Sequence, residues 1–257
     1  MFFDSHAHYN DEAFGDSSQR DALIQALFSS SVSYILNAGT NPVSSKECLK
    51  IAEKYENAYA SVGIHPSDLY ELSSPYDALD EIKKLSQHKK AVAIGEIGLD
   101  YHWHKENKEL QKTFLDLQLS LAEELDMPVI IHDREAHGDC LEAVFAHPKV
   151  KGVFHSFSGS KESAKELIKA GWYISFSGVV TFKNASRLAE TVPSIPLEKM
   201  LIETDCPYLT PHPFRGMRND SSYLTYTAEK IASLHGTDIE TVAKITSDNA
   251  LKLFKIK

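Results

Sequence analysis

The sequence predicts an α/β fold of the (β/α)8 TIM barrel type, with extra helices at its C-terminal end. Eight short apolar runs rich in β-branched residues are typical of strands, and segments with 3.6-residue periodicity separate them. Strands that alternate with helices form a parallel sheet, and eight such strands can close into a barrel. The length of 257 residues also suits a barrel that forms one domain, so we expect residues 1–257 to fold as a single unit.

The predicted strands are short and apolar, and several of them end at a histidine or a carboxylate. In chain order they are Phe2 to Ser5, Ser33 to Asn37, Ala58 to Gly63, Ala91 to Gly95, Pro128 to His132, Gly152 to His155, Trp172 to Ser175, and Lys199 to Glu203. Because neighbouring parallel strands point the same way, these polar ends should meet at one end of the barrel.

The predicted helices fill the intervals between the strands. The clearest of them carries apolar residues on one face, at Leu110, Phe114, Leu117, Leu121 and Leu125. The others between strands lie near residues 17–30, 43–56, 77–88, 135–146, 161–170 and 184–191. Two more helical segments, 222–235 and 238–254, follow the last strand, and Thr237 or Asp238 can cap the second with a side-chain oxygen. We expect these two helices to close the bottom or the side of the barrel.

The composition is that of a globular protein, with 42% hydrophobic and 25% charged residues. The net charge of −9 argues against a nucleic-acid binder with a broad basic surface, but not against a nuclease whose positive charge comes from bound dications. No signal peptide or membrane span is evident, so we expect a cytoplasmic protein without membrane contact. A closed barrel with an acidic surface can stand alone, so we also expect a monomer without an obligate protein partner. Three widely separated cysteines, Cys48, Cys140 and Cys206, are expected to be reduced thiols.

The first strand ends in a pair of histidines, His6 and His8, which project from the same face of an extended strand. Asp4 shares that face but lies deeper, and we expect it to support the histidines rather than bind an ion. A His-x-His pair alone is weak support for a metal site. Active sites of these barrels lie at the C-terminal strand ends, and the remaining strand ends bring further candidates: His65, Glu96, His132 with Arg134, His155, and Glu203 with Asp205.

Imidazoles and carboxylates from several strands are more ligands than one catalytic zinc needs, since such a site takes three protein ligands and a water. Two divalent ions fit this set better. Glu96, on a middle strand, is the natural bridge between them. Asp205 is placed to bind one ion and to orient or deprotonate a bound water, and Glu203 is a further ligand, a partner of the ligands or a catalytic group.

These residues stand in motifs that resemble the TatD family of metal-dependent deoxyribonucleases, within the amidohydrolase superfamily. The motifs span nearly the whole chain in the order of that family: DSHAH at 4–8, VGIHP at 62–66, GEIGLDY at 95–101, IIHDR at 130–134, HSFSG at 155–159, ETDCPYL at 203–209 and RGMRN at 215–219. Two positions depart from the family pattern. Ser156 stands where cysteine is frequent, and Met217 stands where lysine is usual between two arginines, which removes one positive charge near the expected phosphate path.

The resemblance implies which residues would hold each ion. One would be held by His6, His8, Glu96 and Asp205, and the other by Glu96, His132 and His155. It also implies hydrolysis of DNA phosphodiesters, often from the 3′ end, with Mg²⁺, Mn²⁺ or Zn²⁺ as cofactor.

Four residues near the predicted site are candidates for substrate contact: His65, Arg134, Arg215 and Arg218. The arginines suit phosphate groups, although surface arginines without such a role are common. The segment Tyr101 to His104 is aromatic, and either base stacking or packing against the next helix would account for it.

Together these observations predict a metal-dependent DNase that cleaves phosphodiester bonds, with 3′–5′ exonuclease activity on single-stranded DNA. One alternative keeps the metal site and changes the substrate to an ester, a lactone or a deaminable base. Many relatives of that kind bridge their metals with a carbamylated lysine, and no predicted strand end here offers a lysine in place of Glu96. A second alternative is a non-catalytic protein with structural metals, but structural zinc sites tend to be closed and rich in sulfur.

Overall fold

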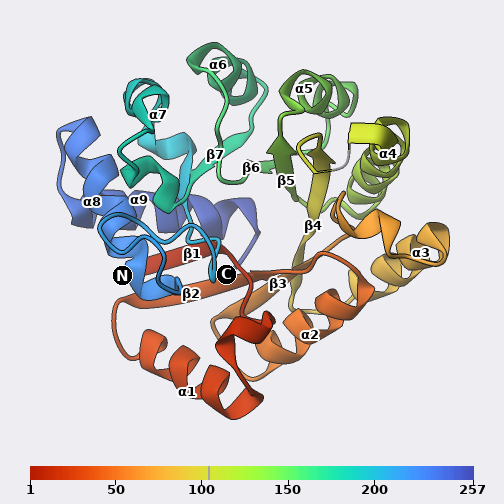
Figure 1. The fold of residues 1–257 in the computed structure, drawn as a ribbon, viewed down its shortest axis with the longest axis horizontal. Helices are drawn as coiled ribbons and strands as arrows, with labels where there is room; N and C mark the ends of the chain where they lie inside the picture. The colour runs from red at the N-terminus through yellow and green to blue at the C-terminus, as the bar shows by residue number, and fades with distance from the viewer. Residues whose placement is uncertain (104) are drawn as a thin grey trace.

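The computed structural model describes residues 1–103 and 105–257, so His104 of the aromatic segment lies outside the described residues. One eight-stranded parallel sheet runs in the order β1 to β8 (Figure 1). The strands are β1 Phe2–Ala7, β2 Val32–Ala38, β3 Ala58–Val62, β4 Ala91–Asp100, β5 Val129–Arg134, β6 Gly152–Phe154, β7 Tyr173–Phe176 and β8 Met200–Ile202. The predicted eight-stranded α/β barrel is confirmed.

Helices surround the strands in Figure 1 and follow them in sequence. They are α1 Ser17–Phe28, α2 Pro42–Glu53, α3 Pro75–Leu85, α4 Lys108–Leu125, α5 His137–Ala146, α6 Lys161–Lys169, α7 Ser186–Thr191, α8 Leu224–His235 and α9 Ile239–Leu253. Asp238 caps α9, because its side chain accepts the backbone N–H of Thr241. No helix in the described ranges is long and apolar enough to span a membrane.

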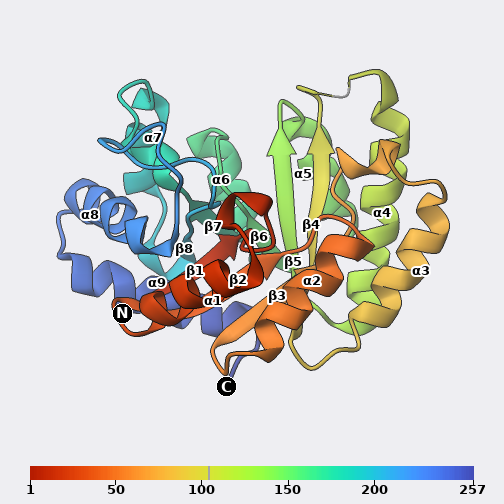
Figure 2. The same cartoon turned by 60° about the horizontal axis from the view of Figure 1, so that its bottom comes forward.

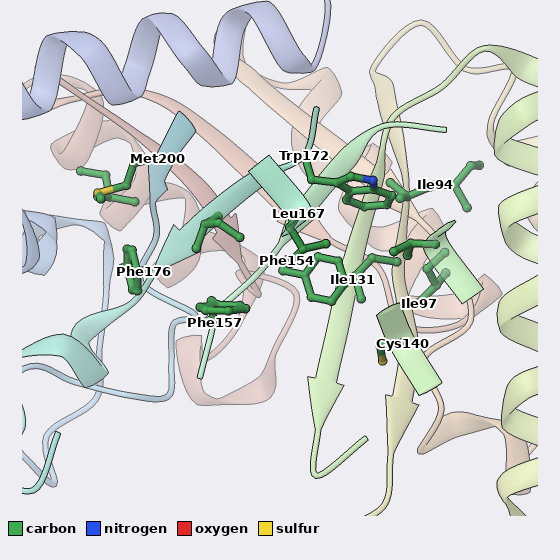
Figure 3. Close-up of a cluster of buried hydrophobic side chains, with 14 of the residues drawn as sticks. Ile94, Ile97, Ile131, Cys140, Phe154, Phe157, Leu167, Trp172, Phe176 and Met200 are labelled. Atoms are coloured by element: carbon green, nitrogen blue, oxygen red, sulfur yellow. The ribbon is translucent and has the colours of Figure 1, made fainter. Parts of the chain in front are cut away.

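Two apolar layers hold the barrel together. The larger layer lies between the strands and the surrounding helices; in Figure 3 the strand residues Ile97, Ile131 and Phe154 pack beside Cys140 of α5 and Leu167 of α6. The smaller layer fills the barrel interior, with inward residues from seven strands: Phe3, Leu36, Ala93, Ile130, Val153, Tyr173 and Leu201. This alternation between the two faces along each strand is the reason that short, almost wholly apolar runs predicted the strands correctly.

Helix α9 closes the N-terminal end of the barrel. Its residues Ala250 and Leu253, together with Phe254 just beyond it, belong to the same apolar cluster as the inward strand residues. The ring of Phe254 lies 6.1 Å from that of Phe3, centroid to centroid. In Figure 2, α9 crosses beneath the strands at the end opposite to the tips of β4 and β5. The expectation that the C-terminal helices close the barrel is therefore confirmed for its bottom.

The first and last strands meet along a seam that continues beyond β8. An isolated parallel bridge joins Ala7 to Cys206. Across it, Asp205 N donates to His6 O at 2.9 Å, and His8 N donates to Cys206 O at 2.8 Å. These backbone bonds place Asp205 between the two histidines, which lie about two hundred residues earlier in the chain.

The fourth strand is the one that extends furthest beyond its predicted end. The sequence predicts that the fourth strand ends at Gly95, whereas β4 continues to Asp100. A side chain at Gly98 would place its Cβ 2.0 Å from His132 O, so glycine lets β4 and β5 approach closely. The extension carries Asp100 to the same level as the end of β5, where Asp100 pairs with Arg134 in the sheet register.

Candidate metal centre

The C-terminal strand ends surround a pocket of about 320 Å³. Its lining comprises His8, Asn10, Asp11, Thr40, His65, Asp68, Glu96, His132, His155, Asp205 and Tyr208. These residues lie in or just after several different strands, so the barrel itself brings them together. Acidic and imidazole groups dominate the pocket, which is the composition expected of a site for cations rather than for an apolar ligand.

Glu96 lies at the centre of this pocket and is buried, with 4% of its surface exposed. Its two carboxylate oxygens face two separate sets of side chains. Oε2 lies 3.3 Å from His6 Nε2 and 3.7 Å from His8 Nε2. Oε1 lies 2.9 Å from His132 Nδ1 and 3.0 Å from His155 Nε2. A carboxylate in this position can bridge two ions.

The first set is completed by Asp205. Its Oδ1 lies 3.3 Å from His8 Nε2 and 3.7 Å from His6 Nε2, and the two histidine nitrogens are 3.1 Å apart. In the second set, His132 Nδ1 lies 3.2 Å from His155 Nε2. Neighbouring ligand atoms around one ion lie ~3.0 to 3.4 Å apart when each bond is about 2.1 Å long. The shorter distances in both sets are close to this range, and the two distances of 3.7 Å join atoms that would lie across the ion from each other.

The outer ring nitrogens of three histidines show which inner nitrogens are free to bind an ion. His8 Nδ1 lies 3.1 Å from Ala38 O, His132 Nε2 lies 3.2 Å from Asp100 Oδ2, and His155 Nδ1 lies 3.2 Å from Glu203 Oε1. Each of these oxygens is an acceptor, so the nitrogen beside it carries the proton. A neutral imidazole then presents a lone pair to the pocket, as a metal ligand must. The donor set fits a cation on each side of Glu96.

The pKa shifts of the pocket residues also indicate a site for cations. Burial would raise the pKa of Glu96, but the imidazoles of His155, His65 and His6 outweigh burial and hold this pKa well below its usual value. Burial likewise opposes protonation of His155, yet Glu96 and Glu203 raise its pKa well above the usual value. A proton on His155 would thus offset carboxylate charge in the pocket, and a bound dication would take its place.

A family model described as TatD related DNase matches residues 3–255 of this chain. The chain belongs to the TatD family. A relative from Bacillus subtilis, named an uncharacterized metal-dependent hydrolase, YabD, is 43% identical over 258 residues and covers 100% of both chains. A relative from Salmonella typhimurium, named 3'-5' ssDNA/RNA exonuclease TatD, is 34% identical and covers 92% of this chain and 93% of its own length.

Solved structures agree with this assignment. The crystal structure of YjjV, a TatD homologue from Escherichia coli, superposes with a TM-score of 0.92 at 29% identity, over 100% of this chain and 98% of that one. A TatD family hydrolase from Entamoeba histolytica superposes with a TM-score of 0.85 at 24% identity, over 98% of this chain and 97% of that one, which supports the fold alone. The predicted family is therefore confirmed.

His65 differs from the other imidazoles of this TatD-family pocket. Its Nδ1 accepts the backbone N–H of Ser67 at 3.1 Å, so the neutral ring carries its proton on Nε2. That nitrogen faces Glu96 Oε1 at 3.4 Å. An N–H group cannot ligate an ion, but it can donate to an oxygen of a substrate. His65 therefore lines the pocket with an N–H group, and its role as a substrate contact stays a prediction.

Glu203 lies behind His155 rather than in the pocket of this TatD-family chain. It is fully buried, and its Oε1 accepts the backbone N–H of Ser156 at 2.8 Å in addition to facing His155 Nδ1. Asp205, by contrast, lines the pocket. Of the roles that the sequence allowed for Glu203, this geometry favours that of a positioning residue for His155.

Asp4 supports the histidines less than the sequence predicts, because its shortest hydrogen bonds go to other residues. Its carboxylate accepts bonds from Thr204 N at 3.0 Å, Thr204 Oγ1 at 2.6 Å and Ser221 Oγ at 2.6 Å. Within the described residues, its link to the histidines is a long bond of 3.4 Å from the backbone N of His6. Asp4 therefore fixes the segment after β8, which carries Asp205. His6 is held in another way, by stacking on His155 with ring centroids 4.1 Å apart.

Asp100 is a residue of the site that the strand-end pattern did not identify. Its Oδ2 faces His132 Nε2, and bonds from His132, Trp103 and His102 overcome burial and lower its pKa to about 2. A carboxylate behind a ligating imidazole fixes the ring orientation and raises the basicity of the inner nitrogen. The signal was present in the sequence, since Asp100 follows Glu96 at an even spacing within one motif. The strand was predicted to end too early to use it.

The three predicted arginines are not among the described residues that line the pocket. The guanidinium of Arg215 lies 3.8 Å from the ring centre of Phe182, and that of Arg218 lies 5.1 Å from the ring centre of Phe14. Arg218 also donates to Ala13 O at 3.1 Å. Arg134 ends β5 beside His132 and is exposed. The structure thus brings Arg134 to the rim of the site, while the contacts of Arg215 and Arg218 are with neighbouring loops.

Proposed function

We propose that this protein, a metal-dependent hydrolase of the TatD family, hydrolyses phosphodiester bonds of DNA and removes nucleotides from the 3′ end of single strands. The observation that carries the proposal is the position of Glu96, whose two oxygens face two complete sets of potential ligands. Two cations beside one carboxylate suit phosphoryl transfer, because they can clamp both the attacking and the leaving oxygen. The name of the Salmonella typhimurium relative supports the choice of substrate.

In this proposal each ion has its own ligands and shares Glu96. His6, His8, Glu96 and Asp205 would hold one ion, and Glu96, His132 and His155 would hold the other. Mg²⁺, Mn²⁺ and Zn²⁺ are all compatible with imidazole and carboxylate ligands. When bound, such ions supply an activated water at neutral pH and neutralise charge on the phosphoryl oxygens.

The side chains of the pocket provide the remaining chemistry. Asp205 lies at the pocket surface with its Oδ1 beside the first set, so it can accept a proton from the attacking water. His65 can donate its Nε2 proton to a phosphoryl oxygen, which stabilises charge that grows during attack. Asp100 and Glu203 hold His132 and His155 in the orientation that leaves their inner nitrogens free.

A nuclease assay tests the proposal directly. Incubation with a 3′-tailed single-stranded oligonucleotide and Mg²⁺ or Mn²⁺ should shorten the strand from its 3′ end, and EDTA should stop the reaction. Glu96→Gln and Asp205→Asn should abolish the activity while leaving the far-ultraviolet circular dichroism unchanged. A panel of esters, lactones and nucleobases belongs in the same experiment. Turnover of these compounds without shortening of DNA would replace the nuclease by a small-molecule hydrolase on the same site.

A further inference from the structure

An aromatic side chain stands in solvent at the rim of the pocket. Trp103 follows β4 and is 63% exposed, although a tryptophan normally buries most of its ring. In Figure 2 the ends of β4 and β5 rise above those of the other strands. Asp100, the last residue of β4, faces His132, which lines the pocket, so Trp103 follows a strand end that lies beside the pocket. The neighbouring Tyr101 is buried and donates to Asp139, so packing explains Tyr101 but not Trp103.

The backbone of Trp103 is tied to the candidate metal centre. Asp100 Oδ1 accepts the N–H of Trp103 at 3.0 Å, while Asp100 Oδ2 faces His132 Nε2 at 3.2 Å. A second anchor joins the segment to the loop after β5, since His102 Nδ1 lies 2.7 Å from Glu135 Oε1. Asp100 therefore links the backbone of Trp103 to His132, a proposed ligand, through one hydrogen bond on each side. Asp100 itself is buried.

A cation accompanies the exposed ring. The guanidinium carbon of Arg134 lies 5.6 Å from the ring centre of Trp103, and the imidazole of His102 meets the ring edge-on with centroids 4.6 Å apart. Arg218 also lies over an aromatic ring, but that ring belongs to Phe14, which is buried. At Trp103 a positive charge and an accessible π surface occur together, and this combination is what unpaired nucleobases and their phosphates bind in single-strand sites.

We propose that Trp103 is a platform on which a nucleobase of the single-stranded substrate stacks, with Arg134 contacting an adjacent phosphate. The inference rests on the proposed function and makes it more specific, because it identifies how the strand is held beyond the scissile bond. Bases of a duplex are already stacked on each other and cannot use such a platform. Trp103 thus selects for unpaired strands without selecting for sequence, since every base has a π face.

Kinetics on two matched oligomers test the platform. One oligomer is a thymidine tract, and the other is a tract of the same length made of abasic tetrahydrofuran nucleotides, with the same phosphodiester backbone. Trp103→Ala should raise KM for the thymidine tract by about tenfold and leave KM for the abasic tract unchanged. Trp103→Phe should restore most of the affinity, because it keeps an aromatic face. Equal effects of Trp103→Ala on both tracts would overturn the inference.

Phe145→Ala provides the matched control, because Phe145 is a 39% exposed aromatic residue in the last turn of α5, far along the helix from the rim. It should leave KM for both tracts unchanged.

Fluorescence separates this inference from the proposed nuclease activity. The chain has two tryptophans, and the second, Trp172, is buried with 1% exposed. Stopped-flow mixing with the thymidine tract and Mg²⁺ should quench the emission of Trp103 before any cleavage, and the abasic tract should not. Quenching without later cleavage would keep the platform and refute the nuclease. Cleavage without quenching would keep the nuclease and refute the platform.

Discussion

His132 and Asp100 form a pair across the ends of β4 and β5, with 3.2 Å between His132 Nε2 and Asp100 Oδ2. The pair leaves His132 Nδ1 facing Glu96 at 2.9 Å. It is the arrangement by which a carboxylate orients a ligating imidazole, and its loss typically weakens metal binding by about 10- to 100-fold.

Asp100→Asn should therefore lower the affinity of the second ion by about tenfold or more while leaving the fold intact. Competition between the protein and a fluorescent chelator for Mn²⁺ or Zn²⁺ measures this affinity. Asp116→Asn is a matched control, because Asp116 also pairs with a histidine, His147, at 2.9 Å but lies on the exposed surface of α4. Equal metal affinity in Asp100→Asn and Asp116→Asn would show that the pair does not tune the site.

His65→Ala should lower kcat by about a hundredfold without loss of metal, because the variant removes a proton donor and no ligand. Elemental analysis of the purified variant gives its metal content, and steady-state kinetics on single-stranded DNA give kcat. If the variant instead lost one ion, His65 would be a ligand and the assignment of its proton to Nε2 would be wrong.

Asp4 should make the stability of the metal-free protein depend on pH. Burial raises the pKa of Asp4 to about 7 from 3.8, despite bonds from Ser221 and Thr204. The folded state then binds a proton that the unfolded state has released, so the free energy of unfolding should fall as pH rises from about 4 to about 7. The full effect is on the order of 4 kcal/mol, from a difference of 7 − 3.8 at 1.36 kcal/mol per pH unit.

Urea unfolding in EDTA at pH 5, 6 and 7 measures the contribution of Asp4. Asp4→Asn should remove it, because an amide can keep bonds to Thr204 and Ser221 without titrating. The difference in unfolding free energy between wild type and Asp4→Asn should therefore shift in favour of the variant with rising pH. A difference that stays constant from pH 5 to pH 7 would mean that Asp4 is ionised throughout this range.

Phe254→Ala should destabilise the protein by about 3 to 5 kcal/mol, because it removes a buried ring from the apolar layer that α9 closes. Phe145→Ala, at a 39% exposed position, should cost much less. Urea denaturation with tryptophan emission reports both. Similar losses for the two variants would show that the layer beneath the barrel contributes little to stability.

The strands and most of the pocket could be predicted because both depend on local order. Short apolar runs rich in β-branched residues identified each strand, and the polar residue at a strand end must lie at one rim of a parallel barrel. His6, Glu96, His132, His155 and Asp205 were found in this way, and the structure brings all five together.

The residues that were misplaced or missed depend on contacts between distant segments. Asp100 was missed because the predicted strand ends at Gly95, whereas β4 pairs with β5 as far as Asp100, and this pairing with a distant segment is not visible in the sequence of β4 alone. Asp4 was assigned to the histidines by its spacing, but its partners lie in the segment after β8. Long side chains such as Arg215 can turn toward either side of a loop, so strand position does not fix their contacts.

Because the candidate metal centre lies on the seam between β1 and the segment after β8, an ion bound there would also affect the stability of the fold. His6 and Asp205 belong to opposite ends of the barrel sequence, and they are joined through one backbone bond and one isolated bridge. An ion bound by both side chains would cross-link β1 to the segment after β8. Such a cross-link would lower the conformational entropy of the unfolded chain and so stabilise the closed barrel. Catalysis and mechanical closure of the barrel would then depend on the same ion.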